Sequence, residues 1–240
     1  VTINGWVYNS RRSGKIGFLT IRDGFGMVQC IVEKKQIGEE SFENFKRLTQ
    51  ESSISVTGQV VENERALGGY EILLDNFIIH HLSNEYPITP KEHGTDFLMA
   101  NRHLWLRSKR QHAILKIRHE IIKSIRDFFD MNDFTLVDTP IFTPNAAEGT
   151  STLFKTDYFN KEAFLAQTGQ LYGEASAMSF GRHYNFGPCF RAEKSKTRRH
   201  LTEFWMVEPE IAYCEIEENM KWSEDLIIYI INQVINKKKN

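Results

Sequence analysis

The first 83 residues alternate between hydrophobic and polar positions in short runs that are separated by turn residues. This alternation is typical of β-strands with one side in a core. The tetrapeptide Asp23-Gly24-Phe25-Gly26 predicts a tight hairpin, because glycine readily adopts positive φ. The pattern predicts strands at 3–8, 16–22, 27–32, 53–61 and 70–79, and a helix at 41–48. Five strands with a helix between the third and fourth favour an OB-fold β-barrel over residues 1–83, although other small barrels share this rhythm.

The pattern changes after a stretch that is rich in proline, glycine and polar residues. Residues 84–107 contain Pro87, Pro90 and Gly94, and they predict a hinge or linker. A period of 3.6 residues then predicts a helix at 108–130, with Ser108 as its N-cap. Further along, the pattern predicts strands at 134–138, 184–193 and 201–213 and helices at 171–180 and 220–234. The expected fold class is α+β, with a second domain over residues 108–240.

Composition narrows the class of protein without naming a function. The chain has 240 residues, of which 41% are hydrophobic and 25% charged, as in ordinary globular domains. We expect no membrane-spanning helix and no signal peptide, and the first residue, Val1, suggests that the sequence begins inside a longer protein. The three cysteines (Cys30, Cys189 and Cys214) are far apart, so we expect no disulfide framework, no zinc site and a reducing, cytoplasmic compartment.

The net charge of −1 gives no overall signal for nucleic acid, but basic residues concentrate in one segment. Residues 101–126 contain eight lysines and arginines and a single acid, Glu120. Such a run is usually the solvated face of a helix, and a phosphate-facing patch is the alternative.

Chemistry is most clearly indicated in the segment 186–204. Arg191 is predicted to lie in a strand that is otherwise apolar, where a guanidinium needs an anion such as a phosphate or a carboxylate. Four cations and His200 follow in the loop 194–200, as a clamp for a polyphosphate would require, and Phe204 is placed to stack on a base. On these residues alone, an ordinary hairpin with a solvated loop and a core phenylalanine is an equal alternative.

This hairpin resembles motif 2 of the class II aminoacyl-tRNA synthetases. Residues 134–140, which end in Pro140, resemble motif 1, and the N-terminal barrel resembles the anticodon-binding domain of the aspartate/asparagine/lysine subgroup. The segments 168–174, 188–193 and 204–210 resemble the asparagine-specific members. No segment resembles the glycine-rich third motif, so we expect a fragment that lacks part of its catalytic domain and is inactive alone.

The resemblance implies ligation of asparagine to its tRNA through an asparaginyl-adenylate, with ATP as substrate. It implies that Arg191 is catalytic, that Glu193, His200 and Phe204 bind ATP with it, and that Mg²⁺ is held by ligands beyond residue 240. Asparagine would bind Glu148, Gln170 and Glu174, and the Glu174 carboxylate would accept from the substrate amide and repel aspartate. Anticodon bases would contact Phe18, Gln29 and Glu71, with a core position as the alternative for Phe18. A homodimer is expected, because helix 108–130 and strand 134–140 expose much apolar surface.

Three other functions stay open at this point. The chain could charge tRNA with aspartate, or with both amino acids. It could be a synthetase-like paralogue without a tRNA role, or a nucleic-acid-binding OB module with a degenerate catalytic half.

Overall fold

The computed structural model describes residues 1–89, 91–147, 152–194, 197 and 199–238. The chain divides into two compact units, Val1–Leu106 and Arg107–Asn240, and each is described by itself. Of the described residues, none belongs to a helix long and apolar enough to cross a membrane.

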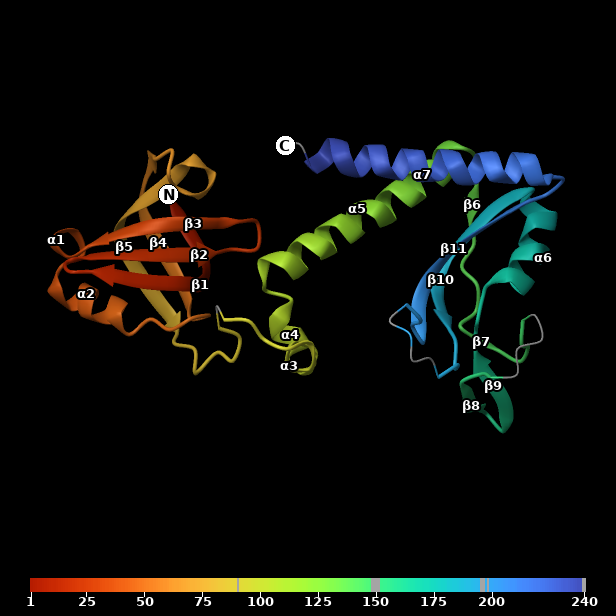
Figure 1. Cartoon of the computed structure of the whole chain (residues 1–240), viewed down its shortest axis with the longest axis horizontal. Coiled ribbons are helices and arrows are strands. Elements are labelled where there is room, and N and C mark those ends of the chain that lie inside the picture. The colour runs from red at the N-terminus through yellow and green to blue at the C-terminus, as the bar shows by residue number, and fades with distance from the viewer. Residues whose placement is uncertain (90, 148–151, 195–196, 198, 239–240) are drawn as a thin grey trace. The chain divides into compact units, whose positions relative to one another are not determined.

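The first unit is built on a closed five-stranded barrel (Figure 1). Its strands are β1 (Thr2–Ser13), β2 (Ile16–Arg22), β3 (Met27–Glu33), β4 (Ser53–Glu62) and β5 (Tyr70–His81), in the order β1-β2-β3-β5-β4. Two short helices, α1 (Lys34–Ile37) and α2 (Glu39–Lys46), connect β3 to β4, and the 3₁₀ turn η1 (Leu67–Gly69) precedes β5. The predicted OB fold is therefore confirmed, with a helix pair where a single helix was predicted.

Alternation along the strands sorts the barrel into an apolar interior and a polar exterior. Val7, Leu19 and Ile21 are buried at 0–1% exposure and point inward, and Phe42 and Phe45 of α2 join the same core. Phe18 lies between two inward positions and is only partly buried, so it faces outward and is not a core residue.

Residues 84–107 contain more regular structure than the linker pattern predicts. Two short helices, α3 (Thr95–Ala100) and α4 (Arg102–Trp105), lie in this segment. The hydroxyl of Tyr86 donates to the carbonyl oxygen of Leu104 at 3.1 Å. This hydrogen bond connects the beginning of the segment to α4.

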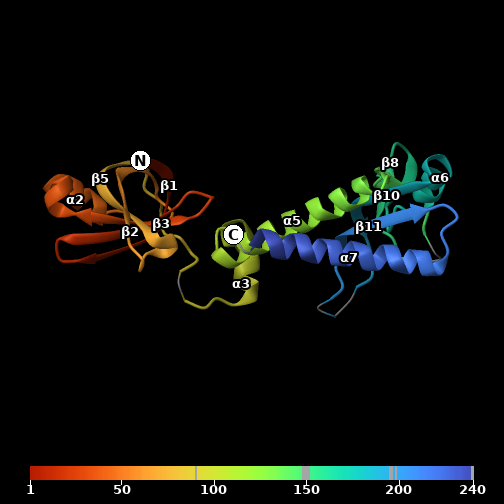
Figure 2. The ribbon, with the colours of Figure 1, turned by 90° about the horizontal axis from the view of Figure 1, so that it is seen from above.

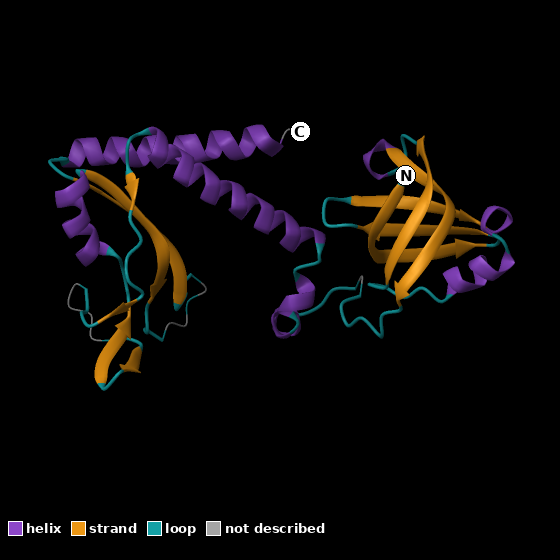
Figure 3. Ribbon diagram, turned by 180° about the vertical axis from the view of Figure 1, so that it is seen from behind, coloured by secondary structure: helices purple, strands orange, loops and turns teal. Residues whose placement is uncertain are grey.

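The second unit combines two long helices with two small sheets (Figures 2 and 3). Helix α5 (Lys109–Met131) begins at Ser108, whose Oγ accepts from the backbone N–H of Gln111 at 3.4 Å, as predicted for its cap. It packs on α7 (Ile216–Lys238) through aromatic contacts, including Phe128 against Trp222 at 6.2 Å between ring centroids. The main sheet has the order β11-β10-β6, formed by β11 (Glu203–Ile211), β10 (Arg182–Phe190) and β6 (Thr135–Leu136). Helix α6 (Gln170–Phe180) packs on β10 and β11.

One prediction for this unit needs correction, and one sheet was missed. The predicted strand 184–193 ends at Phe190, so Arg191 lies just beyond the strand and is exposed. Its backbone N–H still donates to the carbonyl oxygen of Thr202 at 3.0 Å, but its side chain needs no buried anion. The second small sheet, with the order β7-β9-β8, was not predicted, because its strands β7 (Phe142–Thr143), β8 (Lys155–Tyr158) and β9 (Lys161–Leu165) are short and weakly alternating.

Candidate active site

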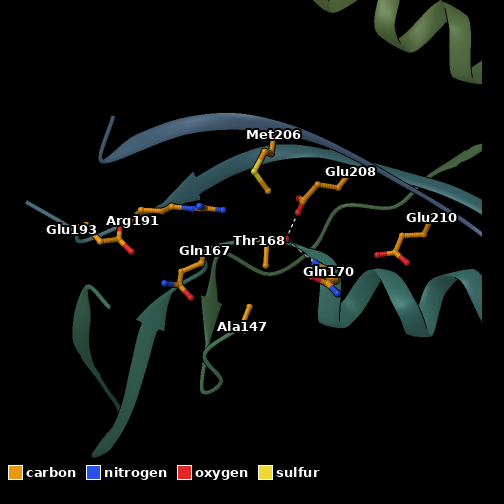
Figure 4. A pocket seen from close by; sticks show the side chains of 9 residues that line it. All are labelled: Ala147, Gln167, Thr168, Gln170, Arg191, Glu193, Met206, Glu208 and Glu210. Carbon is orange, nitrogen blue, oxygen red and sulfur yellow. Dashed lines mark hydrogen bonds between the residues drawn. The ribbon is translucent and has the colours of Figure 1, made fainter. Parts of the chain in front are cut away.

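A cavity of about 350 Å³ opens between β11, the start of α6 and the residues that follow β10 (Figure 4). The segment after β9 also contributes to it. Polar and charged side chains from these four elements face the cavity, whose lining residues are Ala147, Gln167, Thr168, Gln170, Arg191, Glu193, Met206, Glu208 and Glu210. Segments distant in sequence therefore bring one arginine, two glutamines and three glutamates to a single hollow.

Glu208 is a carboxylate of this cavity with several hydrogen bonds to described residues. It accepts from the hydroxyl of Thr168, from the backbone N–H of Gly169 at 3.1 Å and from Nδ2 of Asn185 at 3.1 Å. A Cβ atom at position 169 would lie 2.5 Å from Nδ2 of Asn185. Only glycine therefore lets the backbone of this turn approach the Asn185 side chain so closely. Glu208 thereby fixes the turn that leads into α6 and sets the position of Gln170.

Gln170 and Glu174 lie one turn apart at the start of α6. The side-chain amide of Gln170 donates to Oε1 of Glu174 at 3.2 Å. Gln170 lines the cavity, whereas Glu174 is exposed and is not among the described residues that line it. The structure thus brings together two of the three residues predicted to bind the amino acid; the third, Glu148, lies outside the described residues.

Glu210 follows Glu208 by two positions, so both side chains lie on the same face of β11. Burial raises the pKa of Glu210, and the charges of Glu174 and Glu208 raise it further. A carboxyl in this environment holds its proton more tightly than a free glutamate does.

A second cavity of about 350 Å³ adjoins the same hairpin. Its lining residues are Arg191, Glu193, Arg199, His200, Leu201 and Phe204. The guanidinium of Arg191 lies over the ring of Phe204, 5.6 Å from its centroid, and Nδ1 of His200 is hydrogen-bonded to the hydroxyl of Thr197. All four residues predicted to bind ATP therefore line this cavity, and Arg191 and Glu193 line both cavities.

Sequence reasoning missed four polar residues that line the first cavity, namely Gln167, Thr168, Glu208 and Glu210, as well as the apolar Ala147 and Met206. A signal for the two glutamates was present. Glu208 and Glu210 stand at alternate positions after the hydrophobic run 204–207, so they share one face of the strand. An acidic face on a strand that packs under a helix is unusual unless it borders a polar cavity.

In the barrel, the three residues predicted to read the anticodon lie on adjacent strands. Nε2 of Gln29 donates to Oε2 of Glu71 at 3.3 Å, and the two residues are paired across β3 and β5. Phe18 on β2 pairs with Ile31, two positions from Gln29, and the guanidinium of Arg11 lies 4.7 Å from the centroid of its ring. A half-buried aromatic ring, an amide and a carboxylate therefore lie together on the outer surface of the barrel.

The cysteines give no sign of nucleophilic chemistry. Burial raises the pKa of Cys30 to about 12 and that of Cys189 to about 11, so both thiols stay protonated at neutral pH. Among the residues that the structure describes, no group of three or more histidine, cysteine, aspartate or glutamate side chains could hold a metal ion.

Comparison with known proteins agrees with this geometry. Residues 94–240 match the model of class II tRNA synthetases (D, K and N), and residues 1–79 match that of the OB-fold nucleic acid binding domain. The chain is 57% identical over 240 residues to the asparagine–tRNA ligase of Sorangium cellulosum and 56% identical over 239 residues to that of Desulforamulus reducens. These matches cover the whole chain but 54% and 56% of the two relatives, so the chain spans about half the length of the curated relatives it matches.

The similar solved structures are also aminoacyl-tRNA synthetases. The crystal structure of asparaginyl-tRNA synthetase from Pyrococcus horikoshii complexed with asparaginyl-adenylate superimposes with a TM-score of 0.95 at 40% identity, covering 100% of this chain and 56% of that one. A putative aspartyl-tRNA synthetase from Leishmania major gives 0.85 at 26% identity, covering 100% and 50%. Together with the barrel, the β10–β11 hairpin and the two cavities, these matches establish that this chain belongs to the class II tRNA synthetases of the D, K and N group.

Proposed function

We propose that the natural protein joins asparagine to its tRNA through an asparaginyl-adenylate. The observation that carries this proposal is that two cavities, one rich in carboxylates and amides and the other in cations and an aromatic ring, share Arg191. An aminoacyl-adenylate is an amino acid joined to a nucleotide by one phosphate. A guanidinium at the junction of two such cavities suits that phosphate.

The first step is an in-line displacement at the α-phosphorus of ATP. A carboxylate oxygen of asparagine forms a bond to phosphorus, the bond to the β-phosphate oxygen breaks, and pyrophosphate leaves. Arg191 stabilises the charge that develops on the α-phosphate oxygens, while His200 and Phe204 orient the nucleotide. In the second step a hydroxyl of the terminal ribose of tRNA attacks the carbonyl carbon, and AMP leaves. No covalent bond to the enzyme forms in either step.

Selection of asparagine is assigned to the start of α6. The carboxylate of Glu174 accepts a hydrogen bond from the substrate amide and repels the carboxylate of aspartate. Gln170, together with Glu148, offers oxygen acceptors to the α-ammonium group. The hydrogen bond between Gln170 and Glu174 supports this assignment because it holds the two groups in one orientation.

The barrel is proposed to bind the anticodon. Phe18 stacks on a base, while Gln29 and Glu71 form hydrogen bonds to base edges, as OB-type domains commonly do. The cation–π contact of Arg11 with Phe18 adds a positive charge next to this platform.

Three further expectations accompany the function. Mg²⁺ would accompany the phosphates of ATP and supply additional charge stabilisation there. A homodimer is proposed because α5 exposes apolar side chains, among them Ile114 at 46% and Leu115 at 41%. The compartment is proposed to be cytoplasmic.

The test is ATP–pyrophosphate exchange by the natural full-length protein with asparagine and with aspartate. Exchange that depends on asparagine supports the proposal. Exchange that is faster with aspartate would instead assign the chain to aspartate charging. Activation of asparagine without transfer to tRNA would point to a paralogue that has lost its tRNA role.

A further inference from the structure

One side of α5 carries an unbroken row of basic side chains. Residues 97–119 contain six lysines and arginines and three histidines but no aspartate or glutamate. Positions that recur every three or four residues lie on the same face of a helix. Six successive positions of this kind in α5 are all basic, and we call them the basic stripe: Lys109, His112, Lys116, His119, Lys123 and Arg126.

The basic stripe faces away from the core of the second unit. Ile125, Phe128 and Phe129 lie on the other side of α5 and pack into the core cluster that includes side chains of α7. The first five residues of the stripe are exposed, and only Arg126 is partly buried. Residues 112–119 are exposed on all sides, and Figure 1 shows this half of α5 diverging from α7. The stripe extends over about 25 Å of helix.

Two acids of α5 lie beside the stripe, and both already have partners. Glu120 is only 8% exposed, and its two carboxylate oxygens lie 2.7 and 2.8 Å from Nζ of Lys237 on α7. Asp127 forms an ion pair with Lys123 one turn away. The buried acid is thus neutralised by a lysine from outside the stripe, and the other acid offsets only one of the six positions. The stripe therefore keeps an excess of positive charge.

The stability of the helix does not account for this arrangement. Cations near the N-terminus of a helix oppose its macrodipole, and like charges three or four residues apart repel each other. The first turn of α5 contains no acid and begins with Lys109 and Arg110. The stripe thus destabilises the helix that carries it, and a bound anion along the helix would offset that cost.

On the basis of the proposed tRNA ligase function, we propose that the basic stripe is a second RNA-binding surface, which contacts phosphate groups of the tRNA outside its anticodon. A phosphate backbone presents a continuous row of negative charges, and a row of cations complements it. Lysine, arginine and histidine side chains donate hydrogen bonds to phosphate oxygens. The match of residues 1–79 to a nucleic acid binding domain supports RNA as the partner. Because every tRNA carries the same phosphates, the stripe adds affinity without selecting among tRNAs.

The test is the salt dependence of tRNA binding to the natural full-length protein, measured by filter binding. The variant Lys116→Gln/Lys123→Gln removes two charges of the stripe. Its dissociation constant at 0.1 M salt should rise by about fivefold or more, because each lost phosphate contact releases roughly one counterion fewer. The plot of log affinity against log salt concentration should become shallower by about 1.5. The tRNA that accepts asparagine and an unrelated tRNA should show the same change.

Lys161→Gln/Lys221→Gln is the matched control, since it removes two positive charges elsewhere in the second unit. Lys161 is exposed on β9. Lys221 forms an ion pair with Asp225 one turn away, as Lys123 does with Asp127. The control should bind tRNA like the parent. Asparagine-dependent pyrophosphate exchange should be unchanged in both variants, which would show that both are folded.

Equal weakening in the control would mean that net charge alone lowers the affinity, and it would overturn the inference. Parental affinity and slope in the stripe variant would also overturn it. Weaker binding that is accompanied by dissociation of a dimer in light scattering would assign the stripe to an interface between copies, against the inference. A parent that activates asparagine but binds no tRNA would overturn the tRNA step of the proposed function as well, so the two failures are distinguishable.

Discussion

The side-chain amide of Gln170 donates a hydrogen bond to Oε1 of Glu174 at 3.2 Å, across one turn of α6. Gln170 lines the first cavity, and the turn before it is held by Glu208. Within the part of the chain that the structure describes, the second oxygen of Glu174 accepts no hydrogen bond, so it can accept one from a ligand. The first turn of α6 therefore presents an oriented carboxylate without placing it deep in the protein.

Replacing Glu174 with glutamine should reduce the preference for asparagine over aspartate from both directions. The loss of a charged acceptor should weaken asparagine binding by about 1.5–3 kcal/mol. Removal of the negative charge should relax the rejection of aspartate. Adenylate formation with each amino acid measures both effects in the natural full-length protein. Glu217→Gln, an exposed change on α7, should alter neither rate, and an unchanged preference in Glu174→Gln would place the discrimination on other residues.

Replacing Arg191 with alanine should slow adenylate formation by about 10²–10³-fold, the scale for removing one donor that stabilises transition-state charge. The side chain is exposed and follows the end of β10, so the substitution should leave the thermal unfolding midpoint nearly unchanged. Pyrophosphate exchange reports the rate, and Arg65→Ala on the barrel is the control. A loss of less than about tenfold would show that Arg191 does not act on the phosphate.

Replacing Phe18 with alanine should weaken tRNA binding by about 1–3 kcal/mol, the range for losing one base-stacking ring. Phe18→Tyr keeps an aromatic face and should restore most of the affinity. Because Phe18 faces outward from the barrel, neither substitution should disturb the core. Filter binding measures affinity, and asparagine-dependent pyrophosphate exchange serves as an internal control that should not change. Equal affinities for the alanine variant and the parent would remove Phe18 from the RNA-binding surface.

Tyr184 should make the second unit sensitive to alkaline pH. Burial, followed by the charge of Asp130, raises the pKa of this 1%-exposed phenol from 10.0 to about 12. The native state therefore holds the proton more tightly than the unfolded chain, so the contribution to stability is fully present below pH 10 and is lost as the pH rises towards about 12. Chemical denaturation at a series of pH values should show this loss, and Tyr184→Phe should show a smaller one. Identical pH profiles for the parent and Tyr184→Phe would show that ionisation of Tyr184 does not cause this loss of stability.

The barrel and Arg191 show how much of the fold could be predicted from the sequence. Strict alternation and a glycine-containing turn predicted all five strands of the barrel, because one side of each strand must enter a single core. The same reasoning placed Arg191 inside a strand, whereas the strand ends at Phe190. Element ends depend on which backbone groups find partners across the sheet, and a linear pattern does not contain that information.

The candidate site also divides into residues that the sequence could identify and residues that it could not. Arg191, Glu193, His200 and Phe204 lie within fourteen positions of one another, so a hairpin alone brings them together, and the sequence could identify them. Gln167, Glu208 and Glu210 line the cavity with residues from other segments, and only the packing of α6 on β10 and β11 makes them neighbours.

By itself, the sequence determined the barrel, the long capped helix and the hairpin that we propose to bind ATP, since each depends on local periodicity or on short spacing. Only the tertiary structure decided that Glu210 is a partly buried carboxyl near two other acids, facing a neutral histidine across a glycine. A side chain's charge state depends on burial and on the charges around it, and these are properties of the folded arrangement.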